Sequence, residues 1–356
     1  MTPDGAPVVG FRCDAVARTG VGHLVRCIAL SEELVSRGVG VVFLGDLETL
    51  PWAARQLVAR SLRAVPVRND SEALADMVTA LGLSAVVLDG YDLDPNSGAA
   101  LRARGVVVVA LLDGTFGAAQ EADVYVDQNL GAERPGAAAP EATVLAGLDF
   151  VLLRDVVRSR RALLPSAPEP AADRLRVLAV FGGTDSHDAA VRIVPLLLST
   201  GAAMTVTVVA GRPGAAETLR SLPLGPGQEL AVTPPVDDLP ALVTQSDLVI
   251  SAAGTSVWEL LCLGAATAVV CVSDNQEVGY AQLAAEDLAA PLGRLSELEQ
   301  DEAARDEATR VLGRLAVDPT ARLELSDRGR SRVDGRGRER VADALLRLSD
   351  PSPRGR

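Results

Sequence analysis

The sequence predicts an α/β protein made of two doubly wound domains, and three observations support that prediction. The chain has 356 residues, which suits two domains of roughly 150–180 residues better than one. Nearly continuous apolar runs alternate with amphipathic segments, as buried parallel strands alternate with covering helices. This alternation stops at a stretch rich in Pro and Ala and then starts again.

The first domain is predicted to span residues 1–162. Its strands are expected at 8–12, 39–44, 62–67, 85–88 and 106–112, where β-branched and other apolar residues form short continuous runs. Amphipathic helices are expected at 22–36 and 71–81. Because strands and helices alternate at the spacing of right-handed crossovers, we expect a Rossmann-like fold in this half.

Residues 163–173 are predicted to be the interdomain linker, because three prolines interrupt any helical or strand period there. The second Rossmann-like domain is predicted at 174–349. Its strands are expected at 176–181, 205–210, 229–232, 248–251 and 267–272, with helices at 189–198, 238–245 and 256–263. Residues 296–348 are expected to be helical, and the Arg-rich segment 328–340 is interpreted as a solvated helix face.

Composition excludes several classes of function. The net charge of −13 would repel a phosphate backbone, so no nucleic-acid binding is expected. All 34 Lys and Arg residues are Arg, which excludes a pyridoxal-phosphate Schiff base and a Walker P-loop, because both need a Lys amine. With only two histidines and no ligand cluster, neither a metal site nor a cofactor is expected.

The expected location of the protein is the cytoplasm. No apolar run is long enough to span a bilayer, and the first residues lack the basic and apolar regions of a secretory signal. The four cysteines show no CxxC spacing and lie in apolar stretches, which is typical of reduced, buried thiols. We expect a monomer or a weak homo-oligomer without stable membrane insertion.

Ligands of open α/β sheets bind beyond the carboxyl ends of the strands, where glycine-rich turns expose backbone N–H groups. The first such segment is 12–26, which contains Gly20, Gly22 and His23 directly after the first strand. A capping or packing role for His23 is the alternative to a functional one. His187, the other histidine, follows Asp185 in what resembles a helix cap, so we interpret it as structural.

Two more segments of this kind lie in the second domain. Residues 181–185, Phe-Gly-Gly-Thr-Asp, would present N–H groups and a hydroxyl to a phosphate, although a tight strand-to-helix turn uses the same residues. Residues 251–259 form a small-residue loop that opens a helix, which suits a diphosphate. Glu259, one turn into that helix, suits a ribose hydroxyl pair, and residues 274–276, Asp-Asn-Gln, follow the next strand.

Taken in order, the motifs of both halves resemble one known family. The matching residues are Arg12-x-Asp14, Gly20-x-Gly22-His23-x-x-Arg26, Asp89-x-Tyr91, Phe181-Gly182-Gly183-Thr184-Asp185, Gly254-Thr255-Ser256-x-Trp258-Glu259 and Asn275-Gln276. They resemble the UDP-sugar hydrolases of pseudaminic acid biosynthesis and the related spore-coat polysaccharide biosynthesis proteins, which are relatives of the GT-B glycosyltransferases. The resemblance covers about residues 8–285, and the ordered set is specific where each motif alone is not.

The resemblance implies a GT-B-like arrangement of the two domains with an interdomain cleft. It also implies metal-independent attack of water on the anomeric carbon of a UDP-activated diacetamido-trideoxyhexose of the altropyranose type, which releases UDP. His23 would activate the water, since an imidazole suits this role near neutral pH. Asp14 would orient that imidazole or bind the sugar, and Tyr91 would hold the water or a substrate hydroxyl.

The resemblance further implies a set of substrate-binding residues in the two halves. They are Arg12, Gly20, Gly22, Arg26, Gly183, Thr184, Gly254, Thr255, Ser256, Glu259, Asn275 and Gln276. Backbone N–H groups at 254–256 and 183–184 would stabilise the departing diphosphate without a metal. Glu259 would bind the ribose, and Asn275 and Gln276 would face the sugar or a phosphate.

Three segments depart from familiar patterns. Phe150 precedes Leu-Leu-Arg where the family commonly has Tyr, and the loop at 251–256 lacks an extra Gly that is usual in the family. Both changes leave the identity of the substrate sugar undetermined. Asp92-x-Asp94 has the form of a metal-binding DxD motif but precedes Pro95, so we interpret it as a turn and cap.

Other classes of function compete with the hydrolase. A GT-B glycosyltransferase would share the nucleotide site and pass the sugar to an acceptor, and the phosphate motifs do not separate water from an alcohol. A non-catalytic nucleotide-sugar binder would keep Glu259 but would have no use for His23. A dinucleotide oxidoreductase is disfavoured, because no strand is followed by a complete Gly-x-Gly-x-x-Gly with an acid about 20 residues later.

Overall fold

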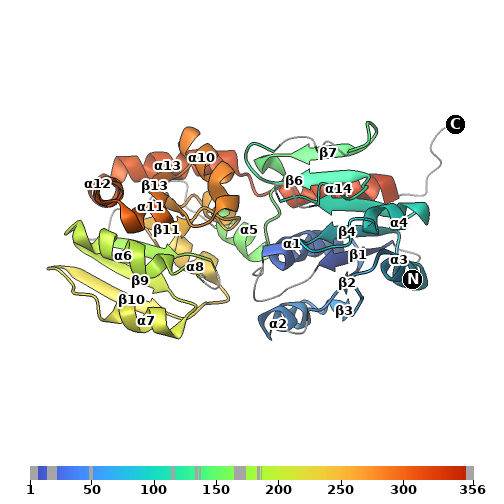
Figure 1. The fold of residues 1–356 in the computed structure, drawn as a ribbon, viewed down its shortest axis with the longest axis horizontal. Coiled ribbons are helices and arrows are strands. Elements are labelled where there is room, and N and C mark those ends of the chain that lie inside the picture. The colour runs from blue at the N-terminus through green and yellow to red at the C-terminus, as the bar shows by residue number, and fades with distance from the viewer. Residues whose placement is uncertain are drawn as a thin grey trace. The chain divides into compact units, whose positions relative to one another are not determined.

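A computed structural model describes residues 7–13, 22–47, 51–113, 117–132, 135, 138–163, 174–182, 185 and 187–349. Its contacts divide the chain into two units, each with its own sheet (Figure 1). The first unit consists of Met1–Asp155 and Gly335–Arg356, and the second of Val156–Asp334. Apart from Leu163, the predicted linker 163–173 lies outside the described residues.

The first unit contains a parallel sheet of seven described strands in the order β3-β2-β1-β4-β5-β6-β7. These strands are β1 (Val8–Cys13), β2 (Gly40–Leu44), β3 (Arg63–Val65), β4 (Ala85–Asp89), β5 (Val107–Leu111), β6 (Val124–Asp127) and β7 (Thr143–Ala146). The helices are α1 (Gly22–Ser36), α2 (Pro51–Ala59), α3 (Ser71–Ala80), α4 (Ser97–Ala103), the short η1 (Leu148–Phe150) and α14 (Gly337–Ser349). The strand order reverses between β1 and β4, which makes their carboxyl ends the switch point where ligands of such sheets bind.

The second unit repeats this plan with six described strands in the order β10-β9-β8-β11-β12-β13. They are β8 (Leu175–Val180), β9 (Met204–Val209), β10 (Gln228–Thr233), β11 (Leu248–Ala252), β12 (Thr267–Cys271) and β13 (Ala290–Arg294). The helices are α6 (Ala189–Ser199), α7 (Pro213–Arg220), α8 (Leu239–Thr244), α9 (Val257–Cys262), η2 (Asp274–Gln276), α10 (Glu277–Ala285), α11 (Leu295–Gln300), α12 (Glu302–Val317) and α13 (Pro319–Arg332). Helix α5 (Asp155–Ala162) begins where the two units meet in sequence, and the switch point here lies between β8 and β11.

The sheet of the first unit is covered on both faces, which explains its continuous apolar strands. One face packs beneath α1 and α14, with Leu24, Ile28 and Val341 in the same buried cluster as Phe11. The opposite face packs beneath α3 and α4 in a separate cluster. No helix in the described part of the chain is long and apolar enough to cross a membrane.

The last helix, α14, belongs to the first unit, although the predicted second domain, 174–349, included it. It packs on α1 and on η1. Gly337 allows its close approach to the end of η1, because a Cβ at that position would lie 2.4 Å from the Val151 carbonyl oxygen. Arg338 is only 3% exposed. The interpretation of 328–340 as a solvated face is therefore wrong at this residue.

Arg338 is buried because three carboxylates surround it. Its Nη1 lies 3.1 Å from Glu32 Oε2 and its Nε 3.1 Å from Glu33 Oε2, and its Nη2 donates to Asp155. Glu32 also accepts a 2.6 Å hydrogen bond from the Asp155 backbone N–H. These contacts fasten the start of α14 to α1 and to the end of the first segment of the unit.

Candidate active site

A buried cluster of polar side chains lies at the switch point of the first unit. His23 is the second residue of α1, Arg26 follows one turn later, and Asp89 is the last residue of β4. His23 Nδ1 lies 2.6 Å from Asp89 Oδ1, and Arg26 donates to both carboxylate oxygens, from Nε at 2.7 Å and from Nη2 at 2.5 Å. The side chain of Asp89 is fully buried.

The carboxylate of Asp89 is ionised in this setting. Burial alone would raise its pKa, but the charge and hydrogen bonds of Arg26, with a smaller contribution from His23, bring the pKa of Asp89 well below its usual range. An anionic Asp89 only accepts hydrogen bonds, so the proton in its contact with His23 is on Nδ1. A neutral His23 then carries its free lone pair on Nε2.

Tyr91 completes the cluster. Its ring meets the His23 imidazole edge-on, with 4.4 Å between the ring centroids. Its hydroxyl donates to Asp113 Oδ2 at 2.8 Å, and burial followed by the charge of Asp113 raises the pKa of Tyr91. The phenol is therefore a neutral hydrogen-bonding group that borders the imidazole, rather than a second base.

Two arginines predicted to bind substrate are buried inside the first unit. Arg26 is 5% exposed, and its nitrogens bond to Asp89 and, from Nη1 at 3.2 Å, to the Leu112 carbonyl oxygen. Three N–H donors of Arg26 are thus used within the protein, and its substrate-binding role stays a prediction. Arg12, at 2% exposed, lies with Nη1 3.5 Å from the Leu44 carbonyl oxygen.

The loop between β1 and α1, residues 14–21, lies outside the described residues. Gly22, the exposed first residue of α1, lies beside His23. Asp14 and Gly20 lie outside the described residues, so their predicted roles stay predictions. Among the described residues, the carboxylate that contacts the imidazole nitrogen Nδ1 is that of Asp89.

In the second unit, the loops after β11 and β12 come together. A Cβ at Gly254 would lie 3.4 Å from Gln276 Nε2, so the two predicted segments touch. Gln276 Oε1 accepts a 3.2 Å hydrogen bond from the Val272 N–H, and the Ser273 hydroxyl donates to Asn275 Oδ1 at 2.6 Å. Thr255, Ser256 and Glu259 are half-buried along the same loop and the start of α9.

The segment that follows β8 also lies at the switch point of the second unit, between β8 and β11. Gly182 has a positive φ of 83°, which favours glycine. Asp185 accepts hydrogen bonds from the N–H groups of Ala189 and Ala190 at 2.8 and 3.0 Å, so its side chain caps α6. Gly183 and Thr184 lie outside the described residues.

Other residues singled out in the sequence lie away from the buried cluster or serve the fold. His187 is exposed. The four cysteines are buried and form no disulfide, as predicted for them. Asp94 accepts from the N–H groups of Ser71 and Asn96 at 3.0 and 2.9 Å, as a turn and cap does. The described part of the chain contains no cluster of His, Cys, Asp or Glu suited to a metal ion.

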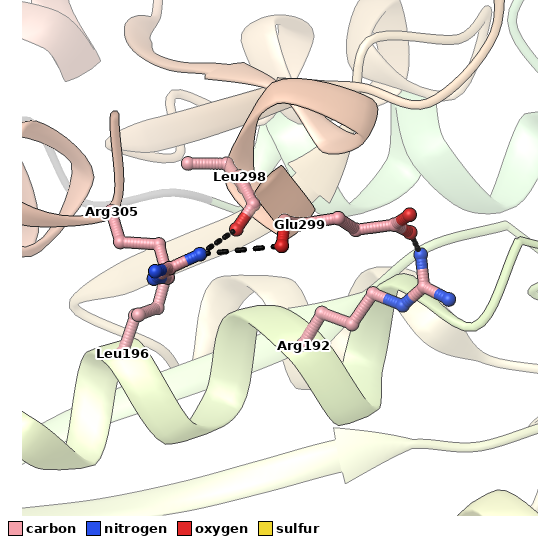
Figure 2. A pocket seen from close by; sticks show the side chains of 5 residues that line it. All are labelled: Arg192, Leu196, Leu298, Glu299 and Arg305. Atoms are coloured by element: carbon pink, nitrogen blue, oxygen red, sulfur yellow. Dashed lines mark hydrogen bonds and ion pairs between the residues drawn. The ribbon is translucent and has the colours of Figure 1, made fainter. Parts of the chain in front are cut away.

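A hollow of about 280 Å³ on the second unit is not part of this site (Figure 2). It lies between α6, α11 and α12, and its lining contains none of the predicted site residues. Its charged groups bind within the protein: Arg192 pairs with Glu299, and Arg305 Nη1 donates to the Leu298 carbonyl oxygen at 3.0 Å.

Two carboxylates, Asp89 in the buried cluster and Asp113 beside Tyr91, were missing from the predicted site. Asp89 stood out only as part of a motif, and Asp113 did not stand out at all. Each had one usable signal, a carboxylate at or just after the carboxyl end of a buried strand. Their partners depend on which strands are neighbours, and that order is not written in the local sequence.

No family model matches the chain. Over 202 residues it is 30% identical to the UDP-N-acetylglucosamine–N-acetylmuramyl-(pentapeptide) pyrophosphoryl-undecaprenol N-acetylglucosamine transferase of Xanthomonas euvesicatoria, a match covering 53% of this chain and 44% of that protein. The match thus spans less than half the length of this curated relative.

Solved structures resemble the chain over nearly its full length. MurG of Acinetobacter baumannii has a TM-score of 0.71 at 17% identity and covers 96% of this chain and 99% of its own. The kitacinnamycin glycotransferase has a TM-score of 0.65 at 16% identity, with 96% and 99% covered. The UDP-GlcNAc 2-epimerase of Neisseria meningitidis, solved with UDP-GlcNAc, has a TM-score of 0.62 at 11% identity, with 96% and 100% covered.

These likenesses confirm the predicted fold class. The chain has a GT-B-like fold built from two doubly wound Rossmann-like domains.

Proposed function

We propose that this protein is an enzyme that uses a UDP-sugar as glycosyl donor and that His23 is its general base. The observation that carries the proposal is the contact between His23 Nδ1 and the buried, anionic Asp89 at a switch point of the sheet. A carboxylate that holds Nδ1–H fixes the tautomer of the imidazole and leaves Nε2 to accept a proton. Tyr91 borders the imidazole and is suited to orient the attacking group.

The nucleotide is proposed to bind to the second unit. The loop at 254–256 and the adjoining Asn275 and Gln276 offer N–H groups, hydroxyls and amides, which suit a diphosphate and the sugar attached to it. Glu259, half-buried one turn further on, is proposed to accept hydrogen bonds from the ribose hydroxyls. Gly183 and Thr184 are proposed to complete the phosphate site after β8.

Transfer of the sugar to an acceptor alcohol is the better supported reaction. The curated relative is an N-acetylglucosamine transferase. Of the three solved structures described above, one is named MurG and another a glycotransferase. In this reaction the alcohol loses its proton to His23 Nε2 as its oxygen attacks the anomeric carbon. The bond from that carbon to the diphosphate breaks, and UDP leaves with the electron pair.

Hydrolysis of a UDP-activated diacetamido-trideoxyhexose is the second candidate. It is favoured by the ordered set of motifs in both halves, and the dyad of His23 and Asp89 is equally suited to activating water. The two reactions share the donor site and the base. They differ only in the acceptor, which makes a direct comparison possible.

The test is UDP release from UDP-GlcNAc and a panel of other UDP-amino sugars, with and without alcohol acceptors, in the absence of added metal. UDP release that depends on an acceptor would support the transferase, and release of free sugar without one would support the hydrolase. His23→Asn should abolish turnover and leave UDP affinity within a few fold, while His187→Asn, its matched control, should retain turnover. If no donor is bound or turned over, the proposed function is wrong.

A further inference from the structure

The contact between His23 and Asp89 has an unusual third member. Arg26 Nη2 and His23 Nδ1 both donate hydrogen bonds to the same oxygen, Asp89 Oδ1. These two donor nitrogens lie only 3.2 Å apart. Since Nδ1 carries a proton here, this short approach is not a hydrogen bond between them. It brings a permanent positive charge against the imidazole.

The second oxygen of Asp89 makes this geometry rigid. Arg26 Nε donates to Oδ2 at 2.7 Å, which gives a two-point contact with the carboxylate and fixes the plane of the Asp89 side chain. The Cys27 thiol also donates to Oδ2, at 3.4 Å. Three hydrogen bonds, two from Arg26 and one from Cys27, thus fix the orientation of the carboxylate. His23 makes the fourth contact, with Oδ1.

We propose that Arg26 is a positioning residue that acts on His23 through Asp89: it fixes the carboxylate against Nδ1, and its charge opposes a second proton on the imidazole. Asp89 alone would favour the imidazolium, because an adjacent anion stabilises a cation. Arg26 offsets that attraction, because its positive charge lies against the same imidazole that the carboxylate orients. A general base works only in its neutral form, so this balance keeps Nε2 available toward lower pH.

Among the described residues, the other ionisable groups around the imidazole do not supply this balancing cation. Tyr91 borders the ring and is neutral, and Asp113, beyond Tyr91, is acidic. Cys13 and Cys27 are buried thiols, and burial raises the pKa of Cys27. Asp127, at the end of β6, has its pKa raised by burial. Arg26 is thus the cation in direct contact with the pair.

The inference rests on the proposed function only where it speaks of catalysis, because the imidazole itself can be observed. The chain has two histidines, so nuclear magnetic resonance of the side-chain nitrogens gives two titration curves, and His187→Gln assigns them. Arg26→Met removes the charge and the donors. We expect the titration midpoint of His23 to rise by about one to two pH units, with the curve of His187 unchanged. Arg26→Lys, which keeps the charge, should cancel most of the rise.

Arg338→Met is the matched control, since Arg338 is an equally buried arginine of the first unit whose partners are other carboxylates. It should leave the midpoint of His23 unchanged. If Arg26→Met does not fold, Arg26→Met combined with Asp89→Asn removes both charges, and its midpoint should exceed that of Asp89→Asn alone by a similar amount. A midpoint that does not rise in these comparisons, or that rises equally in Arg26→Lys, overturns the inference.

Turnover gives the second readout. With an active donor, the acid limb of the kcat/KM profile should move to higher pH in Arg26→Met by the same amount as the titration midpoint, and Arg26→Lys should restore it. A purely structural loss would lower kcat/KM at every pH without moving the limb, which would contradict the inference. A shifted midpoint in a protein that turns over no UDP-sugar would refute the proposed function and support the role of Arg26.

Discussion

Replacing Asp89 by Asn removes one charge and almost no volume from the centre of the candidate site. The amide nitrogen of Asn only donates, yet both oxygens of Asp89 accept hydrogen bonds from Arg26. In either orientation of the amide, its NH2 group therefore faces an N–H donor of Arg26. An NH2 group in the place of Oδ1 would also force the proton of His23 from Nδ1 to Nε2, where it blocks the base.

The expected loss in kcat/KM follows from that tautomer. A positioned general base contributes about 10² to 10⁴ in rate, so we expect Asp89→Asn to lose about two to four orders of magnitude, or about 3–5 kcal/mol of transition-state stabilisation. The variant also leaves the buried Arg26 without its anion. Breaking a buried pair costs about 3–5 kcal/mol of stability, so folding must be measured separately by thermal unfolding.

The assay is a double-mutant cycle on UDP release with Asp89→Asn, His23→Gln and both together. If Asp89 acts only through His23, the double variant should be no slower than His23→Gln, because residues that act as a unit are not additive. UDP affinity serves as the control for the donor site in each folded variant. Additive losses, or an Asp89→Asn enzyme with more than about a third of the activity, would refute the reasoning.

Three further outcomes are expected. Glu259→Ala should weaken UDP binding about 10- to 100-fold in calorimetry before it affects the chemical step, since hydrogen bonds to a charged group contribute about 1.5–3 kcal/mol. Arg338→Met should lower the free energy of unfolding by about 3 kcal/mol in urea, the low end for a broken buried pair, because Glu32 keeps a 2.8 Å contact with Arg60. Because the pKa of Asp89 is lowered on folding, its stabilising contribution is fully present above about pH 4 and is lost as the pH falls further, so acid unfolding curves of the wild type should be steeper there than those of Asp89→Asn.

Each of these outcomes has a control and a contrary result. Glu302→Ala, on the exposed start of α12, should leave UDP affinity unchanged, and an equal loss in both Glu variants would remove Glu259 from the site. Arg310→Met breaks only an exposed pair with Glu307 and should not change stability. Arg338→Met with wild-type stability, or parallel acid curves for Asp89→Asn and the wild type, would contradict the energetic account.

The fold was predictable because burial on both faces of a parallel sheet leaves a mark on every strand. The expected strands at 85–88 and 248–251 correspond to β4 (Ala85–Asp89) and β11 (Leu248–Ala252). The strands β6 and β7 were missed because they are only four residues long and follow turns without a clear period. Short elements draw their stability from neighbours that the local sequence does not contain.

The candidate site was predictable in part. The glycine-rich loops and His23 carry local signals, since a small-residue turn after a strand has a recognisable composition. The partners of His23 depend on the reversal of strand order that brings β4 beside β1. Arg26 was predicted to bind substrate, and no local signal in the sequence indicated that its side chain contacts Asp89. Motif spacing gives the residues of such a site, and tertiary packing decides which of them contact each other.

The position of α14 bears on the order in which the protein folds as it is made. The second unit is one continuous stretch, Val156–Asp334, so all of its strands have been synthesised before α14 begins. The first unit is made earlier but lacks α14, whose Val341, Ala342 and Leu345 fill the core over α1. Arg338, the ion partner of Glu32 and Glu33, also arrives with this helix. The half synthesised first is therefore the half completed last, and until then it exposes the apolar surface that α14 covers.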